Sequence, residues 1–120
     1  MSRTLGQKRA EYCLEMLKNL PCNRDDFKVL SAGLPSMIIQ NGFGQTLAFL
    51  LAKGKEKHLA AFNVIALWLV NRKVLTPSQR QVDILNQISR LEQDGYLHAQ
   101  KETLAMLEWL KRYANAELFG

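Results

Sequence analysis

The sequence predicts an all-α protein, a compact single-domain bundle of about five to six helices covering residues 1–120. Three observations favour this class. Helix-forming residues fill nearly every segment, no segment alternates apolar and polar residues as a strand does, and apolar residues recur every three to four positions. Apolar residues make up 48% of the chain and charged residues 22%, a composition typical of a globular domain.

The first half of the chain is expected to form three helical segments. The first covers about residues 3–20. A short second helix covers about residues 23–33, with Asn23 as its N-cap and two aspartates in its positively polarised first turn. The third begins at Pro35, which suits a first helical turn, and ends at Gly54, which suits a C-terminal cap.

The second half of the chain is expected to form three more helices. Residues 56–73 are apolar on most sides, which favours a central position. The sequence Thr76-Pro77-Ser78-Gln79 combines a capping box with proline at the first helical position, so the next helix should begin there. It is expected to reach about Gln93. Asp94-Gly95 then interrupts the pattern, and the last helix covers about residues 96–118.

Residue types that carry catalysis or bind metals are few and unfavourably spaced. Cys13, Cys22, His58 and His98 form neither a CxxC nor an HxxxH pair, and are expected to be two core-facing thiols and two surface imidazoles. The chain has no GxSxG turn and no complete phosphate-binding glycine loop. We therefore expect a protein that is not an enzyme and has no cofactor, metal or small-molecule substrate.

No segment predicts a membrane or secretory role. The longest apolar stretch, residues 59–70, is too short to cross a bilayer core of about 30 Å. The N-terminal residues lack the apolar region of a secretory signal. A cytoplasmic location is the expectation.

The formal net charge of +5 favours an interaction with polyanions. The candidate phosphate-contacting residues are Lys53, Lys55, Lys57, Arg72, Lys73, Lys111 and Arg112. Structural explanations compete with this one, because cations near helix C-termini offset the helix dipole, and Arg112 is spaced to pair with Glu108. The strongest candidate is the segment of residues 53–58, where Glu56 alone opposes three lysines.

The sequence Asn41-Gly-Phe-Gly44 is unusual within a helical pattern, because each glycine costs about 1 kcal/mol relative to alanine. Two explanations are open. The glycines could permit a close crossing of two helices, or they could form an exposed kink that presents Gln40, Asn41 and Gln45 to a partner.

Two segments resemble signature stretches of a known family. NGFGQTLAFLLAKGK at residues 41–55 and ETLAMLEWLKRYANAEL at residues 102–118 are similar to two patterns of the small subunit of type III-B CRISPR-Cas effector complexes, the Cmr type. Together they cover about a quarter of the chain and stand in the expected order. Residues 73–100 match no signature of that family.

This resemblance implies a non-catalytic subunit of an antiviral ribonucleoprotein, present in several copies. The copies would stack beside the backbone subunits that hold the CRISPR RNA and cut the target, and would contact the large polymerase-like subunit. Their basic surfaces would support the CRISPR RNA–target RNA duplex. The resemblance assigns RNA contact to Lys53, Lys55, Lys111 and Arg112, and the shape of the subunit to Gly42, Gly44 and Trp109.

Two other classes are alternatives. A helical DNA-binding regulator of the helix-turn-helix type would use the helices that flank Thr76-Pro77, with Gln79, Arg80 and Gln81 at the start of its recognition helix. A ligand-binding bundle or hydrolase would need an apolar pocket that holds a titratable group of shifted pKa, and the sequence offers no candidate.

Overall fold

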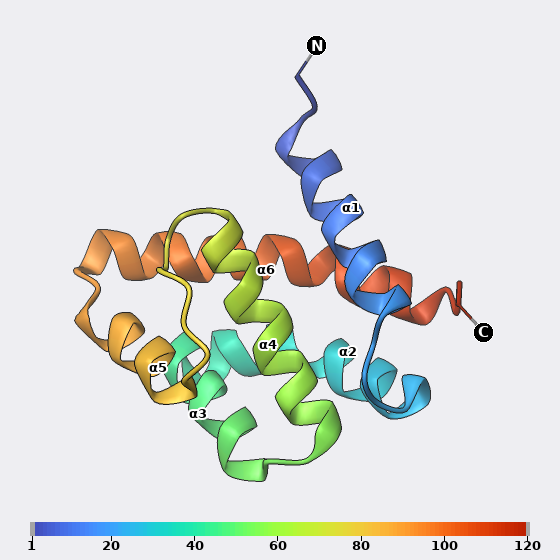
Figure 1. Cartoon of the computed structure of the whole chain (residues 1–120), viewed down its shortest axis with the longest axis horizontal. Helices are drawn as coiled ribbons and strands as arrows, with labels where there is room; N and C mark the ends of the chain where they lie inside the picture. Colours follow the sequence, from blue (N-terminus) through green and yellow to red (C-terminus); the bar gives the residue numbers. More distant parts are fainter. Residues whose placement is uncertain (1, 120) are drawn as a thin grey trace.

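The computed structural model describes residues 2–119, and within them it contains six α-helices and no strand (Figure 1). The predicted all-α class is therefore confirmed. The helices are α1 (Leu5–Lys18), α2 (Arg24–Asn41), α3 (Phe43–Lys53), α4 (Glu56–Asn71), α5 (Gln81–Arg90) and α6 (Gln93–Asn115). No helix within residues 2–119 is both long enough and apolar enough to span a membrane.

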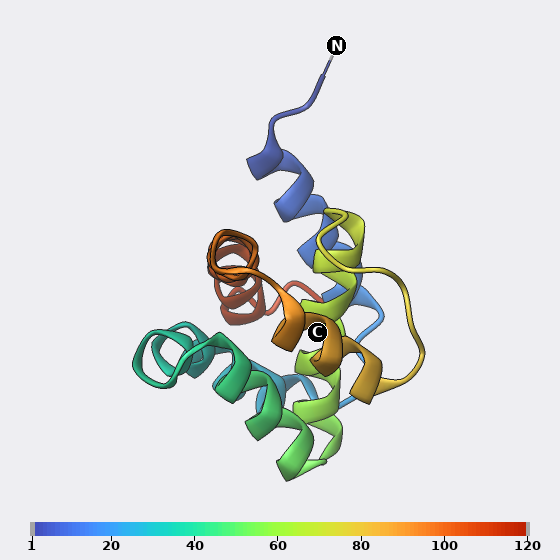
Figure 2. The same ribbon diagram turned by 90° about the vertical axis from the view of Figure 1, so that its left-hand side faces the viewer.

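The long helix α6 organises the packing, because α1, α2 and α4 all contact it. Helix α3 packs against α2, α4 and α5 on the other side of the core. Figure 2 shows α6 nearly end-on, with the N-terminal part of α1 projecting away from the other helices. The predicted central position of α4 is correct, since side chains on most of its sides are buried, including Phe62, Ile65 and Leu69.

Helix α2 corrects the prediction for residues 23–40. Asn23 is the N-cap as predicted, and its side chain accepts a hydrogen bond from the amide of Asp26. The helix then continues through Gly33 and through Pro35, instead of ending at the first and restarting at the second. Proline costs a helix about 3 kcal/mol locally. Packing offsets this cost, because Pro35 and its neighbour Leu34 are both buried in the core.

A sharp break at Gly42 separates α2 from α3. Gly42 has φ +94° and ψ 156°, a conformation that only glycine adopts readily. Its amide donates to the carbonyl of Ile38 at 2.8 Å, and its carbonyl accepts from the hydroxyl of Thr46 at 2.9 Å. The kink foreseen as one of two explanations is therefore present. Gly44 is close to a side chain and not to a backbone, because its amide donates to the Tyr96 hydroxyl at 2.8 Å.

The connection between α4 and α5 corrects a second prediction. Helix α5 begins at Gln81, and the predicted capping box at Thr76 does not form. The side chain of Gln87 instead pairs with both backbone groups of Thr76, at 2.8 and 3.0 Å. Ser78 lies just before α5, and its hydroxyl donates to Asp83 in the first turn of that helix at 3.0 Å. Residues 72–80 thus form a linker much longer than the turn of about 3–4 residues in a helix-turn-helix.

The boundaries of α6 also differ from those predicted. Asp94 and Gly95 do not interrupt a helix but lie in the first turn of α6, which begins at Gln93. Asp94 suits that place, since a carboxylate in the first turn is stabilised by the helix dipole. The helix ends at Asn115, and residues 116–119 form a turn.

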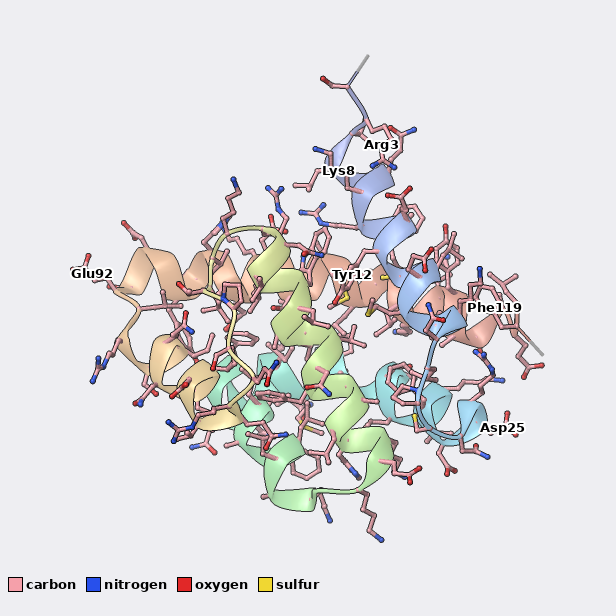
Figure 3. The ribbon with its side chains drawn as sticks, viewed as in Figure 1. Arg3, Lys8, Tyr12, Asp25, Glu92 and Phe119 are labelled. Atoms are coloured by element: carbon pink, nitrogen blue, oxygen red, sulfur yellow. The ribbon has the colours of Figure 1, made fainter. Side chains whose placement is uncertain are left out.

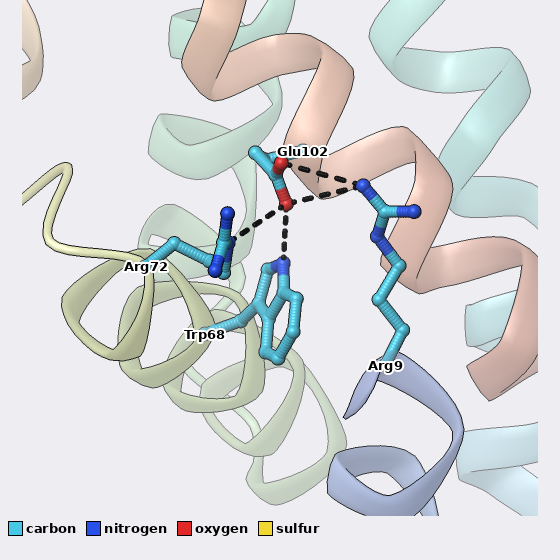
Figure 4. A network of polar contacts seen from close by, with 4 residues as sticks. All are labelled: Arg9, Trp68, Arg72 and Glu102. Carbon is cyan, nitrogen blue, oxygen red and sulfur yellow. Dashed lines mark hydrogen bonds and ion pairs between the residues drawn. The ribbon is translucent and has the colours of Figure 1, made fainter. Parts of the chain in front are cut away.

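A buried carboxylate connects three elements of the fold (Figure 4). Glu102 of α6 is only 5% exposed. Nη2 of Arg9, from α1, lies 3.3 Å from its Oε2, and Nε1 of Trp68, from α4, donates to its Oε1 at 3.3 Å. Nε of Arg72, at the end of α4, lies 3.6 Å from the same Oε1. A buried charge is tolerated only when paired, so these contacts fix α1 and α4 relative to α6.

Replacing Gly42 with alanine should destabilise the protein by about 2 kcal/mol, because an L-residue can adopt this backbone conformation only with strain. A Cβ at Gly42 would meet no described atom within 4 Å, so the loss would come from the backbone alone. Gly33→Ala is the matched control. Gly33 lies within α2, and a Cβ there would also have no neighbour within 4 Å. The alanine substitution should therefore stabilise the protein by about 0.5–1 kcal/mol. Urea unfolding of both variants tests the prediction, and equal effects would contradict it.

Replacing Glu102 with glutamine should destabilise the protein by about 2–3 kcal/mol. The value lies below that of a fully buried pair, because the side chains of Arg9 and Arg72 are 19% and 32% exposed. Glu108→Gln makes the same change at an exposed position of α6 and should cost less than about 0.5 kcal/mol. Chemical denaturation of the two variants measures the difference.

Candidate nucleic-acid interface

The turn between α3 and α4 gathers the strongest predicted cations at one edge of the molecule, away from α6 (Figure 1). Lys53 is the last residue of α3, and Lys55 is the N-cap of α4. Between them Gly54 adopts a left-handed conformation with φ 65°, as its predicted capping role requires. Lys53 and Lys55 are exposed, and Lys57 in the first turn of α4 is partly exposed. We call these three residues the lysine cluster.

The pKa of His58 is affected by the charges of the lysine cluster. His58 is only 6% exposed, which corrects the prediction of a surface imidazole, and its ring packs edge-on against Phe49 at 5.9 Å. Burial lowers the pKa of His58, and the positive charges of the three lysines lower it further. Its Nδ1 has no hydrogen-bond partner within the described part of the chain. Burial and the nearby positive charges therefore keep the ring of His58 neutral near pH 7.

The lysine cluster is bounded by acidic residues on one side. Lys55 and Lys57 line a hollow of about 350 Å³ together with Asp26 and Glu56. On the other side Lys53 lies over the ring of Phe49, at 5.7 Å from its centre. The positive surface is therefore partly neutralised near the start of α2, where Asp26 lies.

The kink at Gly42 creates a second candidate surface next to the first. A hollow of about 500 Å³ at this elbow is lined by Met37, Gln40, Asn41, Gln45, Thr46 and Phe49. The three amides predicted as candidates for partner contact are thus brought together. Phe49 borders both this hollow and Lys53, so the elbow adjoins the lysine cluster at Lys53.

Arg72 and Lys73 lie apart from the lysine cluster. They follow the C-terminal end of α4, whereas Lys55 caps its N-terminal end, about 24 Å away along the helix. Arg72 contacts the buried carboxylate of Glu102, so part of its charge is already paired. Lys73 is exposed and has a left-handed backbone with φ 62°.

Lys111 and Arg112 belong to a different surface, on α6. Both are exposed and line a groove of about 340 Å³ between α2 and α6, together with Lys28, Ala32, Glu108 and Asn115. The predicted pair of Glu108 with Arg112 is not among the ion pairs of residues 2–119. Sequence reasoning missed Lys28, because only the packing of α2 against α6 brings it to this groove.

Trp109 lies at the edge of the core. It is partly buried, and its ring centre lies 5.7 Å from that of Tyr113, one turn along α6. A Cβ on Gly6 of α1 would lie 3.9 Å from the indole ring. Trp109 therefore packs at the contact between α1 and α6.

Groups able to bind a metal do not cluster within residues 2–119, where no three His, Cys, Asp or Glu side chains are placed to hold an ion. Cys13 and Cys22 are both free thiols. Burial raises the pKa of Cys13 to about 12, so this residue stays protonated at neutral pH and is a poor nucleophile.

These features define a class of protein. It is a small all-α domain whose candidate residues lie on open surfaces and in shallow hollows, with cations and amides as the exposed chemistry. The family model Cas_Cmr5, described as a CRISPR-associated protein, matches residues 5–117. The chain belongs to this family, and the resemblance to the small subunit of Cmr-type complexes is thereby confirmed.

Individual relatives agree with this assignment. The chain is 32% identical over 117 residues to the CRISPR system Cmr subunit Cmr5 of Thermus thermophilus, covering 96% of this chain and 93% of that protein. It is 31% identical over 119 residues to the subunit of the same name from Thermotoga maritima, covering 98% and 88%. The crystal structure of a CRISPR-associated Cmr5 family protein from Thermus thermophilus superposes with a TM-score of 0.79 at 28% identity, covering 98% of this chain and 99% of that one.

The lowered pKa of His58 predicts a pH-dependent stability. Because the unfolded chain binds the proton more tightly, the stabilisation is complete above pH 6.5 and is lost as the pH falls toward the lower folded-state pKa. The free energy of unfolding should therefore decrease between pH 7 and 5. In His58→Gln this part of the decrease should disappear, whereas His98→Gln, a change at an exposed histidine, should retain it. An identical pH dependence in wild type and His58→Gln would refute the prediction.

Proposed function

We propose that this protein is a non-catalytic small subunit of a type III-B CRISPR RNA-guided effector complex in the cytoplasm. Several copies provide a basic surface that supports the binding of guide RNA and target RNA in antiviral defence. The observation that carries the proposal is the lysine cluster, which presents Lys53, Lys55 and Lys57 around one turn of a protein that belongs to the Cas_Cmr5 family.

The proposed mechanism is contact with phosphates independent of base sequence. A lysine that neutralises a backbone phosphate releases condensed counterions, which favours binding without reading a base. The adjoining elbow adds amide groups that both donate and accept hydrogen bonds, and Phe49 adds an apolar face between the amides and Lys53. This composition suits a sugar–phosphate chain better than an apolar ligand.

Each copy would bind RNA weakly, because the lysine cluster is small and borders Asp26 and Glu56. Weak contacts become effective when several copies are held in one assembly, since every further contact is then intramolecular. The two Cmr5 relatives are named as subunits of a CRISPR system, which supports an assembly of this kind.

The proposed protein partners are other copies of this chain, the backbone subunit and the large polymerase-like subunit. Helix α2 offers a surface for such contacts, because Val29 and Ile39 are its most exposed large apolar side chains, at 74% and 71%. RNA cleavage in the proposed complex belongs to the backbone subunits.

A DNA-binding regulator of the helix-turn-helix type is not favoured. The linker of residues 72–80 is much longer than the short turn that joins the two helices of that motif. The hollows of residues 2–119 named above are open and shallow, and none of them is the enclosed site that a hydrolase would need.

Alanine at Lys53, Lys55 and Lys57 should weaken target-RNA binding by the assembled complex. If each lysine contacts one phosphate in each copy, the magnitude of the slope of log affinity against log salt should fall by about 2–3 per copy. Filter binding of labelled target RNA at several salt concentrations measures both quantities.

The matched control replaces Lys8, Lys18 and Lys101, which are exposed and take part in none of the ion pairs of residues 2–119. This variant loses the same charge and should keep a salt slope near that of the wild type. An unchanged affinity and slope in the first variant would show that the lysine cluster does not contact RNA.

A further inference from the structure

The groove between α2 and α6 contains three cations from two helices. Lys28 lies on α2, and Lys111 and Arg112 lie on α6. Ala32 and Asn115 complete the lining with small or uncharged side chains, and Glu108 is the acidic residue among the lining residues. The groove is thus a concave surface with a positive charge, on a different part of the molecule from the lysine cluster.

A carboxylate from the turn of residues 116–119 is already paired with one of these cations. Nζ of Lys28 donates to Oε1 of Glu117 at 2.8 Å. This hydrogen bond raises the pKa of Lys28 and lowers that of Glu117, so both groups are charged at neutral pH. Glu117 follows the end of α6 and turns back toward α2 with a left-handed φ of 54°.

A second contact holds the same turn. The guanidinium of Arg24 lies over the ring of Phe119, at 5.6 Å from its centre. Arg24 is itself fixed by donating to the carbonyl of Leu17 at the end of α1. Figure 3 shows Phe119 at the opposite end of α6 from Glu92. The turn of residues 116–119 therefore lies across the start of α2.

The contact between Lys28 and Glu117 has the properties of a reversible one. Its side chains are 34% and 62% exposed, and exposed ion pairs contribute little to stability. The left-handed backbone of Glu117 is unfavourable for a residue with a Cβ, which further lowers the cost of releasing it.

We propose that Lys28, Lys111 and Arg112 form a second binding site for the phosphates of RNA, and that Glu117 covers Lys28 until the RNA displaces it. An intramolecular carboxylate competes at high effective concentration, so a single free anion displaces it poorly. A polyanion with a phosphate at every nucleotide places several charges along the groove at once. This inference rests on the proposed function for the identity of the ligand, but uses residues outside the lysine cluster.

The test measures binding of the isolated full-length chain to a fluorescently labelled RNA duplex of mixed sequence at several salt concentrations. Glu117→Gln should tighten binding about two- to fivefold, which is the range expected for losing one exposed ion pair. It should also raise the salt slope by about 0.7–0.9, because one further phosphate contact forms. In a Lys28→Ala background, the same substitution at Glu117 should have neither effect.

Glu92→Gln is the matched control, since it removes one exposed acidic charge at the far end of α6. It should leave the salt slope unchanged, which separates release of Lys28 from a general gain in positive charge. Equal slopes for Glu117→Gln and Glu92→Gln would overturn the inference, as would a gain that persists without Lys28. Binding of oligoglutamate in place of RNA would also overturn it, by indicating an acidic protein segment as the ligand.

The same measurements separate this inference from the proposed function. RNA binding that depends on the lysine cluster but not on Lys28, Lys111 or Arg112 would remove the second site and leave the function in place. Binding that depends on these three residues but not on the lysine cluster would support the second site alone. Absence of RNA binding by the unaltered chain would overturn the inference. The proposed function would then still be tested by target-RNA binding of the assembled complex with alanine at Lys53, Lys55 and Lys57.

Discussion

The buried carboxylate of Glu102 is the constraint on which the arrangement of the helices depends. A charged group in the core is stable only when its partners stay in place, and those partners come from α1 and from the end of α4. Apolar packing alone would tolerate small sliding movements of one helix along another, whereas one shared carboxylate fixes their register. Because α2 also packs on α6, the groove between these two helices depends on the same fixed position of α6.

This constraint explains why similar cations have different environments. Arg72 and Lys55 stand at opposite ends of α4, yet Arg72 contacts Glu102 while Lys55 faces solvent. The C-terminal end of α4 lies against α6 and contributes to the core, and its N-terminal end extends beyond the core to the turn with α3. A cation at the first end supports the fold, and a cation at the second is available to a partner. Residue type alone does not distinguish the two.

Features set by neighbours in sequence were predicted well. Asn23 caps a helix and Gly54 ends one because the chemistry of each cap involves only nearby backbone groups. Features set by distant residues were not predicted. Pro35 is buried inside α2 although proline favours a helix start. Thr76 pairs with the side chain of Gln87 and does not cap a helix. His58 packs against Phe49 and is not at the surface. The same reasoning applies to the candidate sites. The lysine cluster is contiguous in sequence, so its grouping at one turn could be predicted, whereas Lys28 joins its groove only through the packing of α2 on α6.

Acidic residues next to each basic surface are consistent with weak, repeated binding. Asp26 and Glu56 border the lysine cluster, and Glu117 pairs with Lys28 beside the second groove. A strongly basic subunit would hold any nucleic acid wherever it met one, even outside an assembly. On the proposed function, partial neutralisation would lower the affinity of a single copy, whereas several linked copies would still retain RNA because their contacts would be intramolecular. Retention of RNA would then depend on assembly of the complex, and the acidic residues would contribute to specificity by keeping the free subunit from binding RNA firmly.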